Sequence, residues 1–216
     1  MITLKNLSKS FGGRVLWDDL DLAVEPGRML ALVGASGSGK TTLLNCMGLL
    51  EKPTGGQILF EGTDVTRLSP GKQRRFRRDH LGYLFQNYAL IENATVKANL
   101  DVARRRGTRP DHATALERVG LAGREKEKVH HLSGGEQQRV ALGRLMVKRP
   151  SLVLADESTG ALDHDNGAMV VDVLRRMSRE GCAVVIATHN DSVRDACDTV
   201  FDCGPFRSGR SRPRRR

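Results

Sequence analysis

Residues 34–41 read Gly34-Ala35-Ser36-Gly37-Ser38-Gly39-Lys40-Thr41, and they are the most informative segment of the chain. The apolar run Met29 to Val33 precedes it, and Thr42-Leu43-Leu44 follows it. A strand, a loop of glycines and small residues, and then a helix start form the context of a phosphate-binding P-loop. A chance glycine-rich turn is the alternative, but it needs neither the strand before it nor the helix after it.

The residue types of this loop suit a nucleotide held with Mg²⁺. Because three of its residues are glycines, the backbone can turn so that successive N–H groups point into one concavity. The helix start near Lys40 adds its positive end, and Lys40 supplies a charge for the outer phosphates. The Thr41 hydroxyl is placed to complete a Mg²⁺ shell of oxygens and water. The predicted nucleotide-binding residues are Gly34, Ala35, Ser36, Gly37, Ser38, Gly39, Lys40, Thr41 and Thr42.

Length and composition favour one cytoplasmic domain. A chain of 216 residues fits a single α/β domain with an insertion. Its apolar runs, such as 183–187, are far shorter than the roughly 20 residues of a membrane-spanning helix. Residues 1–5 lack the layout of a signal peptide, and the four cysteines show no CxxC spacing or paired framework. We therefore expect a reduced, cytoplasmic protein.

The formal net charge of +10 is concentrated at one end. Six arginines lie within residues 207–216, and without these six charges the balance falls from +10 to +4. We expect residues 205–216 to form a disordered tail, because they are too polar and Arg-rich to pack. The second basic cluster, Lys72 to Arg78, is predicted to be the solvated face of a helix. No interleaved aromatic stripe supports base stacking, so no nucleic-acid partner is expected.

The remaining pattern predicts an α/β fold with two additions. Residues 1–24 alternate apolar and polar side chains and break at Gly12-Gly13, which predicts a small N-terminal antiparallel β subdomain. From residue 28, strands alternate with helices, which predicts a P-loop NTPase core with a mainly parallel sheet and helices on both faces. Residues 88–131 have helical periodicity and predict a helical insertion. The predicted strands are 28–33, 56–60, 81–86, 152–155, 182–187 and 199–202, and the predicted core helices are 40–50, 70–79, 134–148, 165–179 and 191–197.

Asp156 and Glu157 end a buried strand that begins at Leu152. Paired acids at such a position cost desolvation free energy unless a cation or a reaction uses them. In a P-loop enzyme the first acid holds Mg²⁺ and the second polarises the water that attacks the γ-phosphate. A solvated acidic turn would explain the pair equally well by itself, but beside a P-loop the catalytic interpretation is favoured.

A second anion site is predicted at the start of helix 134–148. Ser133 with Glu136 three residues later is a capping box, and bare glycine amides open the helix at Gly134 and Gly135. The P-loop already surrounds the phosphates of one nucleotide. The simplest use of a second site is therefore a nucleotide held by another copy of the domain, whereas an ordinary capped helix would leave the glycines unexplained.

Together these motifs resemble the nucleotide-binding domain of ABC transporters. The resemblance covers about residues 1–204 and rests on the order of the P-loop, Gln86, 132–137, the acid pair, 160–163 and His189. It implies an ATP-hydrolysing subunit, peripheral on the inner face of the cell membrane, that dimerises around two Mg·ATP molecules and drives a separate membrane permease. Residues 86–96 and 160–163 resemble the ATPases of lipoprotein, macrolide or bacteriocin exporters, and 86–93 is most similar to the bacteriocin type.

The resemblance also implies residue roles. Phe11 matches the aromatic residue on which adenine stacks, although alone it would be read as a core residue. Gln86 matches the glutamine that reaches Mg²⁺ and senses the permease, and Asp163 matches a loop that contacts the opposite subunit's site. His189 matches the histidine that contacts the γ-phosphate. The expected catalytic residues are thus Gln86, Glu157 and His189, the metal ligands are Thr41, Gln86 and Asp156, and further nucleotide contacts come from Phe11, Ser133, Gly134, Gly135, Glu136 and Asp163.

The sequence departs from the family pattern at two positions, and we expect these departures to affect the rate of ATP hydrolysis but not to abolish the activity. Ser158 stands where the family commonly has proline, and Asn190 stands where it commonly has aspartate.

Two other functions compete with transport. A soluble ABC ATPase acting on nucleic acid or the ribosome usually carries two fused domains or a long coiled-coil insertion. A non-catalytic nucleotide sensor is opposed by the intact set Lys40, Thr41, Asp156, Glu157 and His189.

Two surfaces are expected to meet the membrane or its proteins. Tyr88 to Asn93 is apolar for an exposed loop, which favours a groove that receives a short permease helix, with local core packing as the alternative. The Arg-rich tail could touch anionic lipid headgroups, with an inert tail as the alternative.

Overall fold

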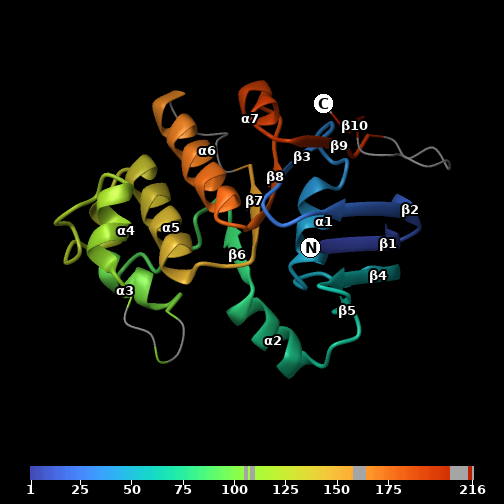
Figure 1. The fold of residues 1–216 in the computed structure, drawn as a ribbon, viewed down its shortest axis with the longest axis horizontal. Coiled ribbons are helices and arrows are strands. Elements are labelled where there is room, and N and C mark those ends of the chain that lie inside the picture. Colours follow the sequence, from blue (N-terminus) through green and yellow to red (C-terminus); the bar gives the residue numbers. More distant parts are fainter. Residues whose placement is uncertain (105–106, 108–109, 158–163, 205–213, 216) are drawn as a thin grey trace.

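The computed structural model describes residues 1–104, 107, 110–157, 164–204 and 214–215 (Figure 1). Two sheets organise this part of the chain. The first has the order β2-β1-β4-β5 and is antiparallel. The second has the order β10-β9-β3-β8-β7-β6, and its strands are parallel except for β10. The strands are β1 (Ile2–Phe11), β2 (Arg14–Val24), β3 (Met29–Val33), β4 (Gly55–Phe60), β5 (Thr63–Asp64), β6 (Leu81–Leu84), β7 (Leu152–Asp156), β8 (Ala183–Ala187), β9 (Thr199–Asp202) and β10 (Arg214–Arg215).

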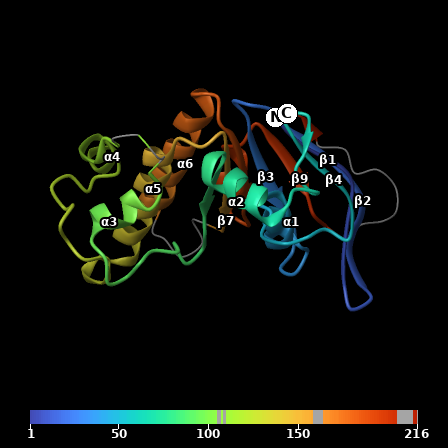
Figure 2. The same cartoon turned by 90° about the horizontal axis from the view of Figure 1, so that it is seen from below.

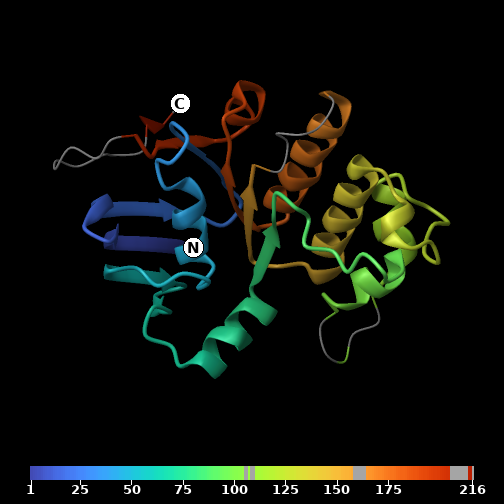
Figure 3. The same cartoon turned by 180° about the vertical axis from the view of Figure 1, so that it is seen from behind.

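Helices cover both faces of the parallel sheet, as predicted. Figures 1 and 3 show α1 beside the antiparallel sheet on one side, and α3, α4, α5 and α6 on the other. Figure 2 shows the same division from below. The helices are α1 (Lys40–Met47), α2 (Pro70–Asp79), α3 (Val96–Asp101), α4 (His112–Arg118), α5 (Gly134–Lys148), α6 (His164–Arg179) and α7 (Asp191–Asp195), with a 3₁₀ turn at Val129–His131.

The alternation of side chains along the parallel strands explains this layering. Leu152 and Leu154 of β7 enter a core shared with α1 and the antiparallel sheet. Val153 and Ala155, which alternate with these two leucines along β7, enter a second core shared with α3 to α7. Because successive side chains of a strand point to opposite faces, a strand buried on both faces must be apolar throughout, and β7 and β8 are fully buried.

Most predicted elements are confirmed, and three differ in a way that has a physical reason. Strand 56–60 was counted with the parallel units, but β4 pairs antiparallel with β1, so it belongs to the N-terminal sheet. The helix predicted as 40–50 ends at Met47, and Gly48 is its C-cap. The strand predicted as 81–86 ends at Leu84, so Gln86 lies in the turn after it.

All four cysteines are buried and form no disulfide, and the expectation of a reduced protein stays a prediction. Within the tail, Arg214 and Arg215 pair with Val200 and Thr199. The rest of the tail lies outside the described residues, and its disorder stays a prediction. No helix in the described ranges has the length and apolarity to cross a membrane.

Candidate active site

The P-loop connects β3 to α1 and is built around glycines that other residues could not replace. Gly34 has a φ of 137°, and a Cβ at this position would lie 2.8 Å from the Ser38 hydroxyl oxygen. Gly39 has a φ of 92°, and its Cβ would lie 2.9 Å from Nε1 of Trp17. Both positions combine a left-handed backbone with a close neighbour, so a side chain would distort the loop.

Lys40 opens α1 and lies back over its own loop. Its Nζ donates hydrogen bonds to the carbonyl oxygens of Gly34 at 2.8 Å and Ala35 at 3.2 Å, and the residue is only 7% exposed. A buried ammonium is thus held at the mouth of the loop by neutral acceptors alone. An anion in the loop would offer it a stronger, charge-assisted partner.

Thr41 and Asp156 are brought together from opposite parts of the chain. The Thr41 hydroxyl donates a 3.1 Å hydrogen bond to Oδ1 of Asp156, which is 8% exposed at the end of β7. Burial raises the pKa of Asp156, the hydrogen bond from Thr41 lowers it, and the neighbouring charge of Glu157 raises it. A bound cation would remove the cost of keeping this carboxylate charged in a buried place.

These residues fit Mg²⁺ and a phosphate chain. Thr41 and Asp156 offer hard oxygen ligands, and Mg²⁺ takes few ligands from protein because it keeps water and phosphate oxygens. Among the described residues no group of three or more His, Cys, Asp or Glu could hold a metal ion. The Ser38 hydroxyl inside the loop is buried without a hydrogen-bond partner, which a phosphate oxygen could supply.

Glu157 and His189 face each other at the ends of β7 and β8. Nδ1 of His189 lies 3.7 Å from Oε1 of Glu157, and their side chains are 63% and 31% exposed. Glu157 has a φ of 41°, unusual for a residue with a side chain, and its N–H donates to the Ala187 carbonyl at 3.0 Å. The strained backbone directs an acid toward solvent directly after the buried Asp156, as expected at a catalytic position.

Gln86 lies at the same edge of the sheet. Leu84 of β6 pairs with Ala155 of β7, so the turn that follows β6 and the acid pair that ends β7 leave the sheet together. Gln86 is exposed in that turn, with no hydrogen bond among the described residues. The edge therefore gathers the three predicted metal ligands and both other catalytic candidates from four neighbouring segments of chain.

The start of α5, where a second anion site is predicted, belongs to the helices on the other side of the sheet from α1. Ser133 caps α5: its N–H donates to Oε2 of Glu136 at 2.8 Å, and its hydroxyl accepts from the Glu136 N–H at 3.4 Å, which confirms the capping box. Ser133 and Gly134 are exposed, and Gly135 is half-buried. Figures 1 and 3 both place α5 across β6 and β7 from α1, so the helix that follows the capping box and the helix that follows the P-loop lie on opposite sides of the parallel sheet.

Sequence reasoning missed Arg124, which supports the capping box. Its guanidinium pairs with Glu136 and, at 2.5 Å, with Glu127. The hydrogen bonds from Ser133 are the main cause of the lowered pKa of Glu136, and Arg124 lowers this pKa further. No sequence motif marks Arg124, because it reaches the cap from a loop before the helix.

The remaining predicted residues are placed as follows. Phe11 ends β1 and is 49% exposed, with Nζ of Lys9 4.3 Å from the centre of its ring, so it is not a core residue. Thr42 is half-buried in the first turn of α1. Asn190, where the family commonly has aspartate, caps α7 by accepting a 2.8 Å hydrogen bond from the Ser192 N–H. Asp163 and Ser158 lie outside the described residues.

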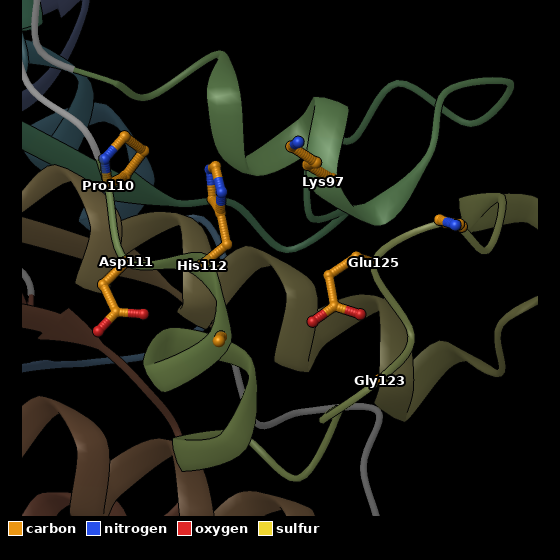
Figure 4. Close-up of a pocket in the computed structure, with 8 residues that line it drawn as sticks. Lys97, Pro110, Asp111, His112, Gly123 and Glu125 are labelled. Atoms are coloured by element: carbon orange, nitrogen blue, oxygen red, sulfur yellow. The ribbon is translucent and has the colours of Figure 1, made fainter.

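The cavity in Figure 4 is separate from these residues. It has a volume of about 620 Å³ and lies among α3, α4 and the loop before residue 127. Its lining carries both signs of charge, with Lys97 and Lys126 opposed to Asp111 and Glu125. None of the predicted site residues lines it.

Comparison with known proteins agrees with this geometry. A family model described as ABC transporter matches residues 17–160, more than half of the chain. The chain belongs to the ABC transporter family. The macrolide export ATP-binding/permease protein MacB of Escherichia coli is 40% identical over 203 residues, which are 89% of this chain and 31% of that protein. The pyoverdine export ATP-binding/permease protein PvdT of Pseudomonas fluorescens is 39% identical over 215 residues, 94% and 32% of the two chains.

Solved structures match the whole fold. The dimeric structure of the ABC transporter cassette MJ0796 has a TM-score of 0.84 and 31% identity, covering 94% of both chains. A dimeric post-hydrolysis state of the same cassette, bound to ADP and Pi, has a TM-score of 0.86 and 29% identity, covering 100% of this chain and 98% of that one. These neighbours are ATP-binding cassettes of ABC transporters, and this chain shares their fold. It spans about a third of the length of the curated relatives.

Proposed function

We propose that this chain is the ATP-hydrolysing subunit of an exporter and that it works as a dimer on a separate membrane permease. The observation that carries the proposal is the convergence of Lys40, Thr41, Asp156, Glu157 and His189 at one edge of the parallel sheet. A nucleotide sensor without turnover would need no acid facing solvent beside the metal ligand. The intact set therefore favours hydrolysis.

Each residue has a definite task in this proposal. The amides of the P-loop and Lys40 hold the phosphate chain, while Thr41 and Asp156 hold Mg²⁺, with Gln86 reaching it from the turn after β6. Mg²⁺, when bound, neutralises phosphate charge. Glu157 accepts the proton of the attacking water, and His189 stands 3.7 Å away to donate toward the γ-phosphate.

Dimerisation is inferred from the two separate places where the chain is expected to bind phosphate, the P-loop and the start of α5. Ser133 and Gly134 at the start of α5 are exposed, and α5 lies across β6 and β7 from α1, so a nucleotide held by a second copy is the simplest partner for them. Two copies arranged head to tail would complete two sites at once. The dimeric structures of the similar cassette MJ0796 support this arrangement.

The permease contact is proposed for the segment 88–93. Arg144 of α5 donates to the carbonyls of Tyr88 at 2.7 Å and Ala89 at 2.6 Å, which fixes a turn in which both residues have positive φ. The buried Asn99 holds Ile91 by hydrogen bonds to its N–H and carbonyl. Ile91 is nevertheless 53% exposed. A large apolar side chain held rigidly in solvent suits a docking helix.

The cargo class is proposed from resemblance alone. Macrolide and pyoverdine export belong to the names of the relatives, which are about three times as long as this chain. For this chain we propose export of a peptide or bacteriocin, a lipoprotein or a drug, with a peripheral position on the inner face of the membrane. A soluble ABC ATPase acting on nucleic acid or the ribosome remains the competing function.

Measuring the ATP-dependent dimerisation of two variants tests the proposed function. Glu157→Gln keeps the shape and hydrogen bonding of the side chain but removes the base, so the ATP-bound dimer should accumulate in size-exclusion chromatography. Ser133→Ala in the same background should return the protein to monomer. A monomer at every ATP concentration in Glu157→Gln would contradict the proposed assembly.

A further inference from the structure

The hairpin between β1 and β2 brings a second cation to the P-loop. Arg14 is the first residue of β2 and pairs with Phe11 across the hairpin. Its Nη2 atom lies 4.0 Å from the position that a Cβ on Gly37 would take. Gly37 is in the middle of the P-loop, and both residues are exposed. The guanidinium therefore lies beside the phosphate-binding turn from outside the motif.

The position of Arg14 is tied to the loop by the residues that follow it. Trp17 is fully buried, and its Nε1 lies 2.9 Å from the Cβ position of Gly39. Cδ1 of Leu16 lies 3.3 Å from the same point. Because β2 packs against the P-loop two and three residues after Arg14, the hairpin cannot move independently of the loop.

The charge of Arg14 is uncompensated in the described part of the chain. No hydrogen bond or ion pair joins it to any described residue. The neighbouring cations differ: Nζ of Lys9 donates to Glu51 at 2.5 Å and to the Lys52 carbonyl at 2.7 Å, and Lys40 is held by the loop carbonyls. A guanidinium offers a fork of N–H donors that matches phosphate oxygens, and the anion that this site is built to hold is a phosphate chain.

We propose that Arg14 is a nucleotide-binding residue whose guanidinium contacts the phosphate chain held by the P-loop. The inference rests on the proposed function, since it assumes that the loop binds nucleotide. In this proposal Arg14 contacts the nucleotide in the ground state, so the main effect of its removal falls on binding. Its removal should therefore raise the KM for ATP and the Kd for ADP while kcat is kept.

Isothermal titration calorimetry with Mg·ADP tests the contact. Arg14→Gln should raise the Kd about five- to tenfold, as expected for losing a partly exposed charge-assisted hydrogen bond. Arg14→Lys keeps the charge without the fork and should raise the Kd less. Arg67→Gln is the matched control, because Arg67 is an exposed arginine, 82% accessible, that lies 3.6 Å from Asp64; its Kd should equal that of wild type.

Salt dependence separates a phosphate contact from a structural role. Raising ionic strength should weaken ADP binding more in wild type than in Arg14→Gln, because one screened charge interaction is missing in the variant. A Kd for Arg14→Gln within twofold of wild type, or an increased Kd with unchanged salt dependence, overturns the inference. Failure of the wild-type protein to bind ADP would instead overturn the proposed function itself.

Discussion

Asp156 accepts a 3.1 Å hydrogen bond from the Thr41 hydroxyl, which joins the first turn of α1 to the end of β7 across 115 residues of sequence. Thr41 comes from the motif that holds phosphates, and Asp156 comes directly before the acid that would activate water. The bond keeps two proposed metal ligands together. The hydrogen bond from a neutral hydroxyl does not fully offset the burial of the Asp156 carboxylate, and burial is the main cause of the raised pKa of Asp156.

The first prediction concerns stability and pH. A carboxyl whose pKa is higher in the folded than in the unfolded protein stabilises the fold fully below its unfolded pKa, and this contribution is lost as pH rises through its folded pKa. The buried Asp156 should therefore make the nucleotide-free protein less stable as pH rises through that value. Asp156→Asn removes the charge, so its Tm should exceed that of wild type at neutral pH by about 2–4 °C, corresponding to about 1 kcal/mol.

Differential scanning calorimetry at acidic and neutral pH measures this difference. Mg·ADP should stabilise wild type at neutral pH and stabilise Asp156→Asn much less, because a metal ligand has been lost. A variant that is no more stable than wild type at neutral pH, or that keeps the full Mg·ADP increment, would show that Asp156 is not a buried metal-binding charge.

The second prediction compares two helix caps. Ser133 caps α5 and Thr95 caps α3, where its hydroxyl accepts a 3.1 Å hydrogen bond from the Ala98 N–H. Alanine at either position should cost about 1 kcal/mol of unfolding free energy. Only Ser133→Ala should also lower ATP hydrolysis, because only this cap faces the partner's nucleotide in our proposal. Equal ATPase rates in the two variants, normalised to folded protein, would reduce Ser133 to an ordinary cap.

The third prediction concerns permease docking, and here the structure changes the choice of variant. Leu90 is an apolar residue of this segment, but it is half-buried against the core of α3 to α7, so Leu90→Glu would also disturb folding. Ile91 is 53% exposed. Ile91→Glu should keep the Tm and the basal ATPase rate while reducing co-purification with the permease and uncoupling hydrolysis from transport. Normal co-purification and transport would exclude a docking role for this segment.

The fourth prediction concerns the Arg-rich tail. Each basic residue close to an anionic membrane contributes about 1 kcal/mol of binding free energy. Deleting residues 207–216 should reduce sedimentation with anionic vesicles at low salt and have little effect at high salt. Equal sedimentation of the full chain and the truncated chain would mean that the tail is inert.

The sequence was most informative where local chemistry determines the structure. Helix 134–148 has the predicted bounds because a capping box starts it and Arg149, with a φ of 49°, ends it. The pairing of β4 was not predictable from periodicity, because strand alternation specifies faces but not partners. Only the register of Ile2 with Phe60 and Leu4 with Ile58 shows that β4 lies against β1.

In the candidate site, too, the residues that sequence motifs mark could be predicted, and the residues brought there by tertiary packing could not. Motif residues such as Lys40 and Glu157 could be predicted because their spacing is set by one loop or one strand end. Arg14 and Arg124 could not, because each reaches the site through tertiary packing, from a hairpin and from a loop. Arg14 follows Phe11 by three residues, and only the hairpin pairing of these two residues in the structure brings Arg14 to attention.

Steady-state ATP hydrolysis by the wild-type chain and by Glu157→Gln, each with Mg²⁺ and with a chelator, tests the central claim most directly. Wild type should show slow turnover that disappears with the chelator. Glu157→Gln should bind ATP with unchanged affinity but turn over at least about a hundredfold more slowly, the range of a lost general base. Hydrolysis by Glu157→Gln at the wild-type rate would contradict the assignment of Glu157 as the base.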